Sequence, residues 1–351
     1  MKWNRLWERI SNWENWPFML RYLPIGPAWA WYCIKSRSLW FFTPSNPTLT
    51  FGGFEGEGKK EMYNLLPEGS YPKTIYIQPG QHFEEVKQYV AAAGFSYPFC
   101  VKPDVGMKGL LFRKIDTEAD FKTYHQLMPA EYIVQELVDY GLEVSVFYYR
   151  YPHQQKGIIS GFIQKELMEV TGNGKDTLLQ LIQKHPKAKH REGEMRAKHA
   201  EHLNTILNPG AKFYLSYAAN LNRGARFINL EHLIDERLHH LFDELSHRGT
   251  FYYGRYDIKC ASIEDLKRGQ NFSILEFNGS GAEPNHVYNA GLTLRQAHEI
   301  ILKHWEALYQ ISKYNNAQGI RYWGFLRGWR FLRQAKKHLK ILEAYDAKIG
   351  L

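Results

Sequence analysis

The chain has 351 residues, enough for about two domains with a sizeable hydrophobic core. An apolar content of 44% excludes an intrinsically disordered protein. The formal net charge of +9 leaves three kinds of anionic partner open, namely nucleic acid, a membrane surface and a charged substrate.

The first 50 residues are rich in aromatic and basic side chains and contain two pairs of tryptophans at helical spacing. Trp3 and Trp7 are four residues apart and Trp13 and Trp16 are three apart, so we expect each pair on one helix face. The segment shows no export signal, and no run of about 18 apolar residues predicts a membrane span. These features predict a cytoplasmic protein.

The cysteine content agrees with a reducing compartment. Cys33, Cys100 and Cys260 lie far apart and show no CxxC spacing. We therefore expect small core residues rather than disulfides or a zinc site.

Helices and strands alternate over the next part of the chain. The expected elements are a helix over 59–66, a strand over 73–80, a helix over 82–94, strands over 97–104 and 110–115, and a helix over 117–127. Thr117 is the expected N-cap of the last helix, and Gly94 is expected to end the earlier one.

The second half continues with strands and longer helices. The expected elements are strands over 132–138 and 142–150 joined by a turn at Tyr140–Gly141, a strand over 157–167 in the same sheet, a helix over 178–184, a polar helix within 185–208, an amphipathic helix within 229–249, strands over 254–262 and 272–278, and helices over most of 292–314 and 326–346. His199 and His202 are three residues apart, but no third ligand at metal-site spacing accompanies them.

A group of acidic and amide side chains stands at the ends of two strands. A charged turn joins the strands over 254–262 and 272–278, most simply as an antiparallel hairpin. Alternation along each strand puts Arg255 with Asp257 on one face, and Glu276 with Asn278. The hairpin therefore predicts that the two carboxylates and the amide converge. Such oxygen ligands suit Mg²⁺ or Mn²⁺, whereas the alternative is a strand end with an acid that faces solvent.

Earlier segments offer what a nucleotide would need beside such a cation. Lys102 ends a strand and precedes a loop with Gly106 and Gly109, whose backbone N–H groups can approach a phosphate. The spacing is neither a dinucleotide-binding fingerprint nor a Walker motif, and a surface lysine before a turn is the alternative. In "VQELVDYGLE" a strand end can pair with adenine and Glu143 can accept from ribose hydroxyls, or Glu143 is a solvent-facing acid.

These pieces, in this order, resemble the ATP-grasp superfamily. The matching segments are Lys102 with its loop, "QELV…LE", "GRYDIK" and "LEFN". They are most similar to the D-alanine–D-alanine ligase branch, while "VTGNGKDTLLQLI" and "AANLNRGARF" resemble loops of the cyanophycin synthetase ATP-grasp domain. The resemblance spans about 97–290. It implies an α/β (α+β) chain of ATP-grasp fold, with two α/β lobes that clasp ATP.

The resemblance also implies roles for residues that match the motifs. Lys102 would hold the ATP phosphates, Glu136, Leu137 and Val138 would lie along the adenine, and Glu143 would bind the ribose. Further phosphate candidates are Gly106, Lys108, Gly109 and Lys175.

The metal and catalytic roles follow from the later motifs. Asp257, Glu276 and Asn278 would ligate one or two Mg²⁺, and Arg255 would act with Lys102 in catalysis by stabilising charge on the transferring phosphoryl group or on the tetrahedral intermediate. A substrate carboxylate would attack the γ-phosphate, and an amine would then displace phosphate from the acyl phosphate. The substrates would be small-molecule or peptide carboxylates and amines. The alternatives from other classes are a phosphotransferase and a non-catalytic nucleotide-binding protein of a membrane surface.

Two departures from the family leave the substrate open. The metal strand continues as "NGSGAEPNHVY", where the D-alanine ligases have NTxPG, so D-alanine is not implied. "NPTLTFGGFEGEGKK" stands where substrate contacts would be expected, and it has no assignment beyond that or a turn with solvated charges.

The two ends of the chain differ from its middle. All ten Trp lie in 1–40 or 305–329, and from Arg321 to Leu351 eight Lys or Arg accompany two acidic residues. Trp with Lys and Arg on an amphipathic segment fits an anionic membrane surface, at the inner face of the membrane for a cytoplasmic protein. The alternative is that the two ends pack together. Nucleic acid is not expected, because no motif for it is present.

These observations divide the chain into four parts. The expected division is an aromatic and basic arm over 1–60, a partial N-terminal α/β lobe over 61–96, the ATP-grasp domain over 97–290 and C-terminal helices with a basic amphipathic tail over 291–351.

Overall fold

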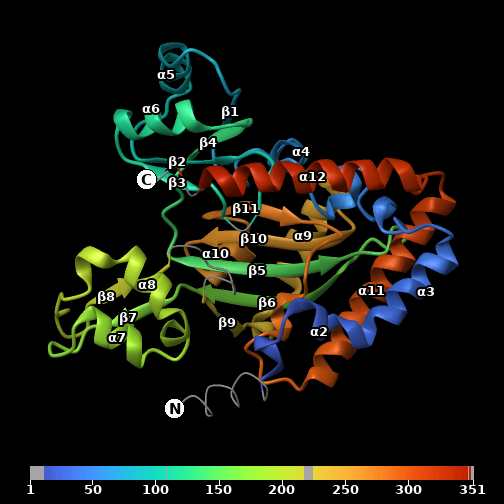
Figure 1. Ribbon diagram of the computed structural model, residues 1–351. Helices are drawn as coiled ribbons and strands as arrows, with labels where there is room; N and C mark the ends of the chain where they lie inside the picture. The colour runs from blue at the N-terminus through green and yellow to red at the C-terminus, as the bar shows by residue number, and fades with distance from the viewer. Residues whose placement is uncertain (1–11, 108, 217–223, 347, 349–351) are drawn as a thin grey trace.

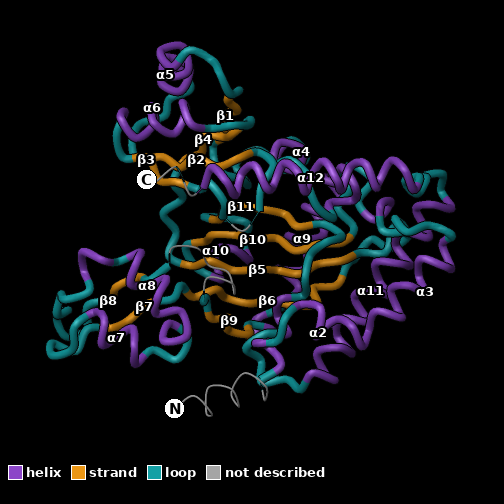
Figure 2. Tube along the Cα trace, viewed as in Figure 1, coloured by secondary structure: helices purple, strands orange, loops and turns teal. Residues whose placement is uncertain are grey.

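The computed structural model describes residues 12–107, 109–216, 224–346 and 348. The described part contains two antiparallel sheets, each with helices against it, and a small third module (Figure 1). Figure 2 shows the strands gathered in these three groups. The mixed helix and sheet class predicted from the sequence is confirmed.

The first lobe is a four-stranded sheet with two helices. Its strands, in the spatial order β1-β4-β2-β3, are β1 (Thr74–Ile77), β2 (Phe99–Pro103), β3 (Arg113–Ile115) and β4 (Tyr132–Glu136). The helices α5 (Phe83–Ala92) and α6 (Glu118–Leu127) pack on this sheet and share its core. Thr117 caps α6 as predicted, because its hydroxyl accepts from the backbone N–H of Asp120.

The second lobe is a five-stranded sheet. Its strands, in the order β11-β10-β5-β6-β9, are β5 (Leu142–Tyr149), β6 (Ile158–Glu166), β9 (Arg226–Asn229), β10 (Tyr253–Cys260) and β11 (Phe272–Asn278). The helices that share the core on one face are α4 (Lys59–Tyr63), α9 (Glu236–Gly249) and α10 (Ile263–Lys267). Val144 and Tyr256 point into this core, so alternation turns Ser145 and Asp257 to the opposite face.

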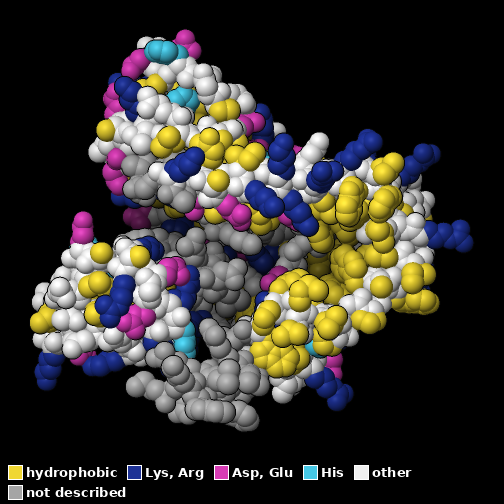
Figure 3. Space-filling view, viewed as in Figure 1, with side chains coloured by type: hydrophobic (Ala, Val, Ile, Leu, Met, Phe, Trp, Pro, Cys, Tyr) yellow, Lys and Arg dark blue, Asp and Glu magenta, His cyan; other side chains and the backbone are white. Residues whose placement is uncertain are grey.

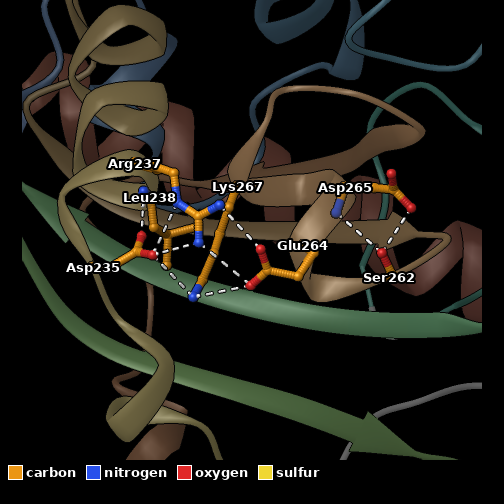
Figure 4. Close-up of polar contacts among 7 residues, drawn as sticks. All are labelled: Asp235, Arg237, Leu238, Ser262, Glu264, Asp265 and Lys267. Carbon is orange, nitrogen blue, oxygen red and sulfur yellow. Dashed lines mark hydrogen bonds and ion pairs between the residues drawn. The ribbon is translucent and has the colours of Figure 1, made fainter.

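The connection between β10 and β11 is held by ion pairs that Figure 4 shows. The sequence predicts a charged turn there, and the structure adds the one-turn helix α10, which Ser262 caps. Arg237 on α9 lies 3.0 Å from Glu264 and 2.8 Å from Asp235, and Lys267 lies 3.2 Å from Asp235. The two pairs of Arg237 are exposed and stabilise a fold little individually, whereas the Lys267 side chain is only 7% exposed. Together they fix how the connection sits against α9.

The third module consists of β7 (Glu169–Thr171), β8 (Lys212–Tyr214), α7 (Leu178–Lys184) and α8 (Glu192–Lys198). The polar segment 185–208 was expected to be a solvated helix, and this holds only in part. It forms α8 between short 3-10 turns and buries Ala188 and Met195 in the core of the module. The buried ring of His199 bonds the carbonyl of Leu215 at 3.1 Å, which gives it a structural role.

The segment 137–141 connects the two lobes. The sequence predicts a turn between two strands at Tyr140–Gly141, and both strands exist. They belong to different sheets, β4 to the first and β5 to the second. The turn is therefore a crossover between lobes rather than a hairpin.

The two ends of the chain pack against each other. The helices concerned are α2 (Phe18–Tyr22), α3 (Gly26–Ser36), α11 (Leu294–Ala317) and α12 (Phe325–Asp346). Ring centroids of Trp29 and Trp305 are 5.1 Å apart, and those of Tyr32 and Tyr309 are 4.8 Å apart. Trp13 is buried and donates to the carbonyl of Leu292, whereas Trp3 and Trp7 lie outside the described residues.

Helix α12 spans both lobes (Figure 1). Near its start, the indole N–H of Trp40 donates to the carbonyl of Phe325 at 3.1 Å. Near its end, Leu342 is fully buried in the core of the first lobe, and Asp346 pairs with Arg113 at 3.0 Å. The predicted basic tail is thus a helix packed across the molecule.

None of the helices in the described residues has the length and apolar character to cross a bilayer. The predicted domain boundaries stay predictions. The one between residues 96 and 97 falls inside the first sheet, because β1 pairs with β4.

Candidate nucleotide and metal site

The hairpin at the centre of the predicted site is present. In the β10–β11 ladder, Asp257 lies opposite Glu276 and Arg255 lies opposite Asn278. Cross-strand partners share a face of the sheet, so the four side chains gather on the face opposite the core that the sheet shares with α4, α9 and α10. The Asn278 amide donates to Asp257 at 3.3 Å. The four side chains therefore converge, as alternation along the strands predicts. The role of Asp257, Glu276 and Asn278 as metal ligands stays a prediction.

Asp257 is surrounded by cations. The Arg255 guanidinium reaches its two carboxylate oxygens at 3.1 and 3.2 Å, and the Lys165 ammonium lies 3.0 Å away. The Ser145 hydroxyl also donates to Asp257. Burial by itself raises the pKa of Asp257, but Arg255 and Lys165 outweigh it and hold this pKa well below its usual range. Asp257 is thus a fixed anion.

Lys165 on β6 is a site residue that the sequence analysis missed. Its side chain is only 7% exposed and bridges Asp257 and Glu143, which lies 3.4 Å away. Burial raises the pKa of Glu143, and Lys165 opposes that rise. The predicted ribose-binding acid is therefore a half-buried group at the start of β5, held by a lysine, rather than a solvent-facing one.

A cavity of about 160 Å³ adjoins the metal-ligand candidates. Glu276 and Asn278 line it from the second lobe, and the loop over 105–107 lines it from the first lobe. The glycine-rich segment over 53–59 closes another side. The last wall is α12, through Ala335, His338 and Leu339. The cavity lies between the lobes, where a nucleotide with its cation would be expected.

The glycine-rich segment contributes two charged residues that the sequence analysis left unassigned. Burial raises the pKa of Glu57 to about 7, and its Oε2 has no hydrogen-bond partner among the described residues. The Lys59 ammonium donates to the carbonyls of Asp104 and Gly106 at 3.2 and 3.3 Å. Burial lowers the pKa of Lys59. Both side chains line the cavity, so the segment is part of the site.

Close backbone contact explains why this segment and the loop after β11 are both rich in glycine. The N–H of Gly281 donates to the carbonyl of Gly53 at 3.2 Å, and the N–H of Ser280 donates to that of Gly52 at 3.0 Å. A Cβ on Gly281 would lie 2.0 Å from the carbonyl oxygen of Phe54. Only glycine fits there. The loop after β11, which departs from the D-alanine ligase pattern, therefore packs directly against the glycine-rich segment.

Lys102 lies on β2, directly before the loop that lines the cavity. Burial lowers its pKa, while Cys100 and then Glu276 favour its charged form. The side chain is half-buried and its charge interacts with Glu276, a metal-ligand candidate of the other lobe. Lys59 thus lines the cavity with positive charge, and Lys102 acts on the cavity residue Glu276 through its charge.

The loop after β2 is partly described. Gly106 lines the cavity, and the backbone carbonyl of Val105 accepts from the His338 ring of α12 at 3.0 Å. Gly109 has a φ of +69°, a conformation that favours glycine. Lys108 lies outside the described residues. Helix α12 therefore holds the loop that was predicted to bind phosphate.

The predicted adenine-binding residues lie at the crossover between the lobes. Glu136 ends β4 and accepts from the backbone N–H of Lys73 at 3.0 Å. Leu137 is 40% exposed, and the carbonyl of Val138 accepts from Lys259 on β10 at 3.0 Å. The crossover is thus tied to both lobes. The contact of these residues with a nucleotide stays a prediction.

Lys175 lies in the third module, apart from the residues above. It is exposed in the turn before α7, where its backbone N–H donates to Asn173. No contact joins it to the cavity within the described residues. Its role as a phosphate ligand stays a prediction.

The donor set suits a hard cation. Asp257, Glu276 and Asn278 offer oxygen atoms, which Mg²⁺ and Mn²⁺ prefer. In the part of the chain that the structure describes, no three His, Cys, Asp or Glu side chains form a metal-sized cluster. A cation at Asp257 would compete with Arg255 and Lys165, which already pair with this carboxylate. The role of the three residues as metal ligands stays a prediction.

Among known proteins, only solved structures are similar to this chain. No family model and no curated protein sequence matches the chain. The similar structures include a bifunctional glutathione synthetase from Pasteurella multocida, with 14% identity and a TM-score of 0.40 over 71% of this chain and 36% of that one. D-alanine–D-alanine ligase from Bacillus anthracis has 13% identity and a TM-score of 0.40 over 73% and 68%. ATP-grasp ligase PsnB complexed with minimal precursor has 15% identity and a TM-score of 0.37 over 70% and 60%.

The chain is similar to ATP-grasp proteins. The resemblance predicted from the sequence therefore recurs among solved structures. The chain spans between 36% and 68% of the length of the three proteins above. Because the identities are 13–15% and the TM-scores 0.37–0.40, we argue function from the residues of this chain alone.

Proposed function

We propose that the chain is an ATP- and Mg²⁺-dependent ligase that joins a carboxylate to an amine through an acyl phosphate. The observation that carries the proposal is the β10–β11 pair, which gathers Asp257, Glu276 and Asn278 beside Arg255. A cavity that both lobes line adjoins these side chains, and Lys102 brings a cation toward Glu276 from the other lobe. The substrates would be small-molecule or peptide carboxylates and amines.

The nucleotide would lie between the lobes. Lys102 and Lys59 would neutralise its phosphates, with backbone N–H groups of the loop over 105–109 as further donors. The crossover residues Glu136, Leu137 and Val138 would lie along the adenine, and Glu143 would accept from the ribose. Both lobes are tied to the crossover, which supports this placement.

The reaction would proceed by positioning and charge neutralisation. Bound Mg²⁺ would neutralise charge on the phosphates and orient them. The substrate carboxylate would attack the γ-phosphorus, and ADP would leave. Arg255 would stabilise the charge that develops on the transferring group, because it stands opposite Asn278 beside the same strand ends. The amine would then attack the acyl carbon and release phosphate.

Glu57 is a candidate acceptor for the proton that the amine loses. It lines the cavity, has a buried oxygen without a hydrogen-bond partner in the described residues and has a pKa of about 7. A carboxylate with a pKa near the operating pH is suited to general base catalysis.

The proposal is tested by measuring ADP release against pools of carboxylates and amines. A ligase releases ADP and free phosphate only when both substrates are present, and a product with a new amide bond accumulates. A phosphotransferase would instead leave the phosphate on its product. Absence of ADP release with every pool would contradict both and favour a non-catalytic nucleotide-binding protein. The matched control is Glu276→Gln, which should release ADP at least about 100-fold more slowly with a pool that is active for the wild type.

A location in the cytoplasm at the inner face of the membrane is also part of the proposal. The segments that support a membrane surface are separate from the catalytic residues, so that part can be tested on its own.

A further inference from the structure

One face of the molecule exposes an unusual number of large apolar side chains. Ten of them, each 52–69% exposed, come from two segments far apart in the sequence; these are Phe18, Met19, Leu20, Leu23, Trp31, Ile34, Leu39, Phe325, Leu326 and Trp329. We call this set the apolar face. Elsewhere in the described residues, only Tyr89 and Ile206 expose half or more of a large apolar side chain. Contiguous exposed apolar surface of this kind marks an interaction site.

The two segments adjoin each other in space. Figure 3 shows a broad apolar surface where α2, α3 and the start of α12 lie in Figure 1. Ile34 and Leu39 line a shallow hollow together with Phe325. Trp40 bonds the carbonyl of Phe325 and packs against Gly328, where a Cβ would lie 2.4 Å from its indole nitrogen. The apolar face is therefore one surface built on a fixed junction.

Charge in these segments has a single sign. Residues 18–40 and 320–342 together contain ten Lys or Arg and no Asp or Glu. The whole chain has 45 basic and 36 acidic residues, so the remainder, with 35 and 36, is close to neutral. The basic excess of the protein thus lies entirely in the two segments that build the apolar face.

The basic side chains are placed around the apolar ones. The Lys35 ammonium lies 5.4 Å from the ring of Trp31, and the Arg327 guanidinium lies 3.8 Å from that of Trp323. Arg37, Arg330 and Arg333 are exposed. Long basic side chains that rest their stems on apolar surface can keep their charges at the level of lipid headgroups.

We propose that the apolar face inserts into the interfacial region of an anionic lipid bilayer. Leu, Ile, Met and Phe would enter the acyl boundary, Trp31 and Trp329 would lie at the interface, and the surrounding Lys and Arg would meet anionic headgroups. A nucleic acid fits less well, because six of the ten side chains of the apolar face are aliphatic and offer no stacking plane for bases. A second copy of the chain also fits less well, because the ten basic residues of one copy would face the ten of the other and repel them. The inference does not rest on the ligase activity.

The position of α12 links this surface to the candidate site. Phe325, Leu326 and Trp329 stand near the start of the helix, and Ala335, His338 and Leu339 further along line the cavity. At 1.5 Å per residue, Trp329 and His338 are roughly 14 Å apart along the axis. A bilayer that binds the apolar face would therefore contact α12, the same helix that forms one wall of the cavity.

The test is cosedimentation of the full chain with vesicles of phosphatidylcholine, with and without phosphatidylglycerol, at low and high salt. Binding should require phosphatidylglycerol and should weaken with salt. The double variant Leu326→Ser/Trp329→Ser should lower binding at least tenfold. The double variant Arg330→Gln/Arg333→Gln should lower it roughly tenfold at low salt and much less at high salt.

Matched controls separate the face from general effects of the substitutions. Tyr89→Ser/Ile206→Ser removes equally exposed apolar groups from elsewhere, and Lys156→Gln removes an exposed charge far from the two segments; both should bind as the wild type does. All substituted side chains are exposed, so thermal melts should be unchanged. The proposal is overturned if the full chain ignores anionic vesicles at low salt, or if the control and test variants bind alike. Dimers in sedimentation velocity that Leu326→Ser/Trp329→Ser dissociates, without vesicle binding, would assign the face to a second copy instead.

Discussion

Asp257 and Glu276 lie directly opposite each other in the β10–β11 ladder, with their side chains on the same face of the sheet. Two carboxylates at cross-strand distance, about 5 Å between Cβ atoms, repel each other unless positive charge lies between or beside them. Arg255 and Lys165 supply this charge on the side of Asp257. A bound Mg²⁺ would supply it for the pair.

Binding of Mg²⁺ with ATP should therefore stabilise the protein. At a free ligand concentration of about 100 times Kd, the free energy of unfolding should rise by about 2.7 kcal/mol and the melting temperature by several degrees. Differential scanning fluorimetry with ATP, with Mg²⁺ and with both measures this shift. Lys102→Met should remove most of it, while Lys156→Met, at an exposed pair with Glu236, should keep it. An undiminished shift in Lys102→Met would exclude Lys102 from the phosphate site.

Glu276→Gln should fold normally and lose activity. The change keeps the size of the side chain, removes one of two facing charges and leaves a weaker metal ligand, so turnover should fall about 100-fold or more. Steady-state ADP release measures turnover, and a thermal melt verifies folding. Glu264→Gln is the matched control, because Glu264 is exposed and paired with Arg237 away from the cavity. Wild-type turnover in Glu276→Gln would remove Glu276 from the site.

The part of the site on β10 and β11 could be predicted because its signals are local. Alternation along two strands joined by a short connection fixes which side chains share a face, and Asp257, Glu276 and Asn278 follow from it. Thr117 as a helix cap is equally local. The order of the strands beyond this hairpin cannot be predicted from any single segment of the sequence.

The parts that were missed depend on contacts between distant segments. Lys165 reaches Asp257 only because β5 lies between β6 and β10, a neighbour relation that the sequence of β6 does not reveal. Glu57 and Lys59 reach the cavity because their segment docks on the loop with Gly279 and Gly281. The sequence shows the two glycine-rich stretches, 52–58 and 279–281, separately. Only the fold shows that their backbones lie in close contact, which is why both are rich in glycine.

Gly281→Ala should disturb the contact between the loop after β11 and the glycine-rich segment over 53–59. The new Cβ would meet the carbonyl oxygen of Phe54 at 2.0 Å, so backbone must move, which we expect to cost about 1–3 kcal/mol of stability. Because the displaced segment carries Glu57 and Lys59, activity should fall as well. Urea unfolding and ADP release measure the two effects. Gly193→Ala is the control, since nothing lies within 4 Å of its Cβ, and it should be neutral or slightly stabilising. Equal stability of the two variants would contradict the close approach.

The last prediction concerns two histidines that are buried on the same face of the second sheet as Asp257, because Phe147 beside them lies opposite Arg255 in the β5–β10 ladder. His286 and His304 have ring centroids 5.4 Å apart, and Phe147 packs edge-on against His304. Burial lowers the pKa of His286 to about 4, and burial together with His286 lowers that of His304 well below its usual range. Both are therefore neutral in the folded protein at neutral pH, and neither has a partner for Nδ1 within the described residues.

The sign of the pH dependence follows from linkage. The unfolded chain takes up these protons near the ordinary pKa of about 6.5, whereas the folded chain resists them, so the unfolded state binds more protons as the pH falls. The free energy of unfolding should therefore fall between about pH 6.5 and pH 4, the value to which the pKa of His286 is lowered, by up to about 1.4 kcal/mol per pH unit for each histidine. Above this window the stabilising effect is complete. His286→Gln should remove one histidine from the slope, while His82→Gln, at an exposed position before α5, should leave it as it is. Urea unfolding across the window measures the slope, and an identical slope in His286→Gln and the wild type would show that His286 does not titrate on unfolding.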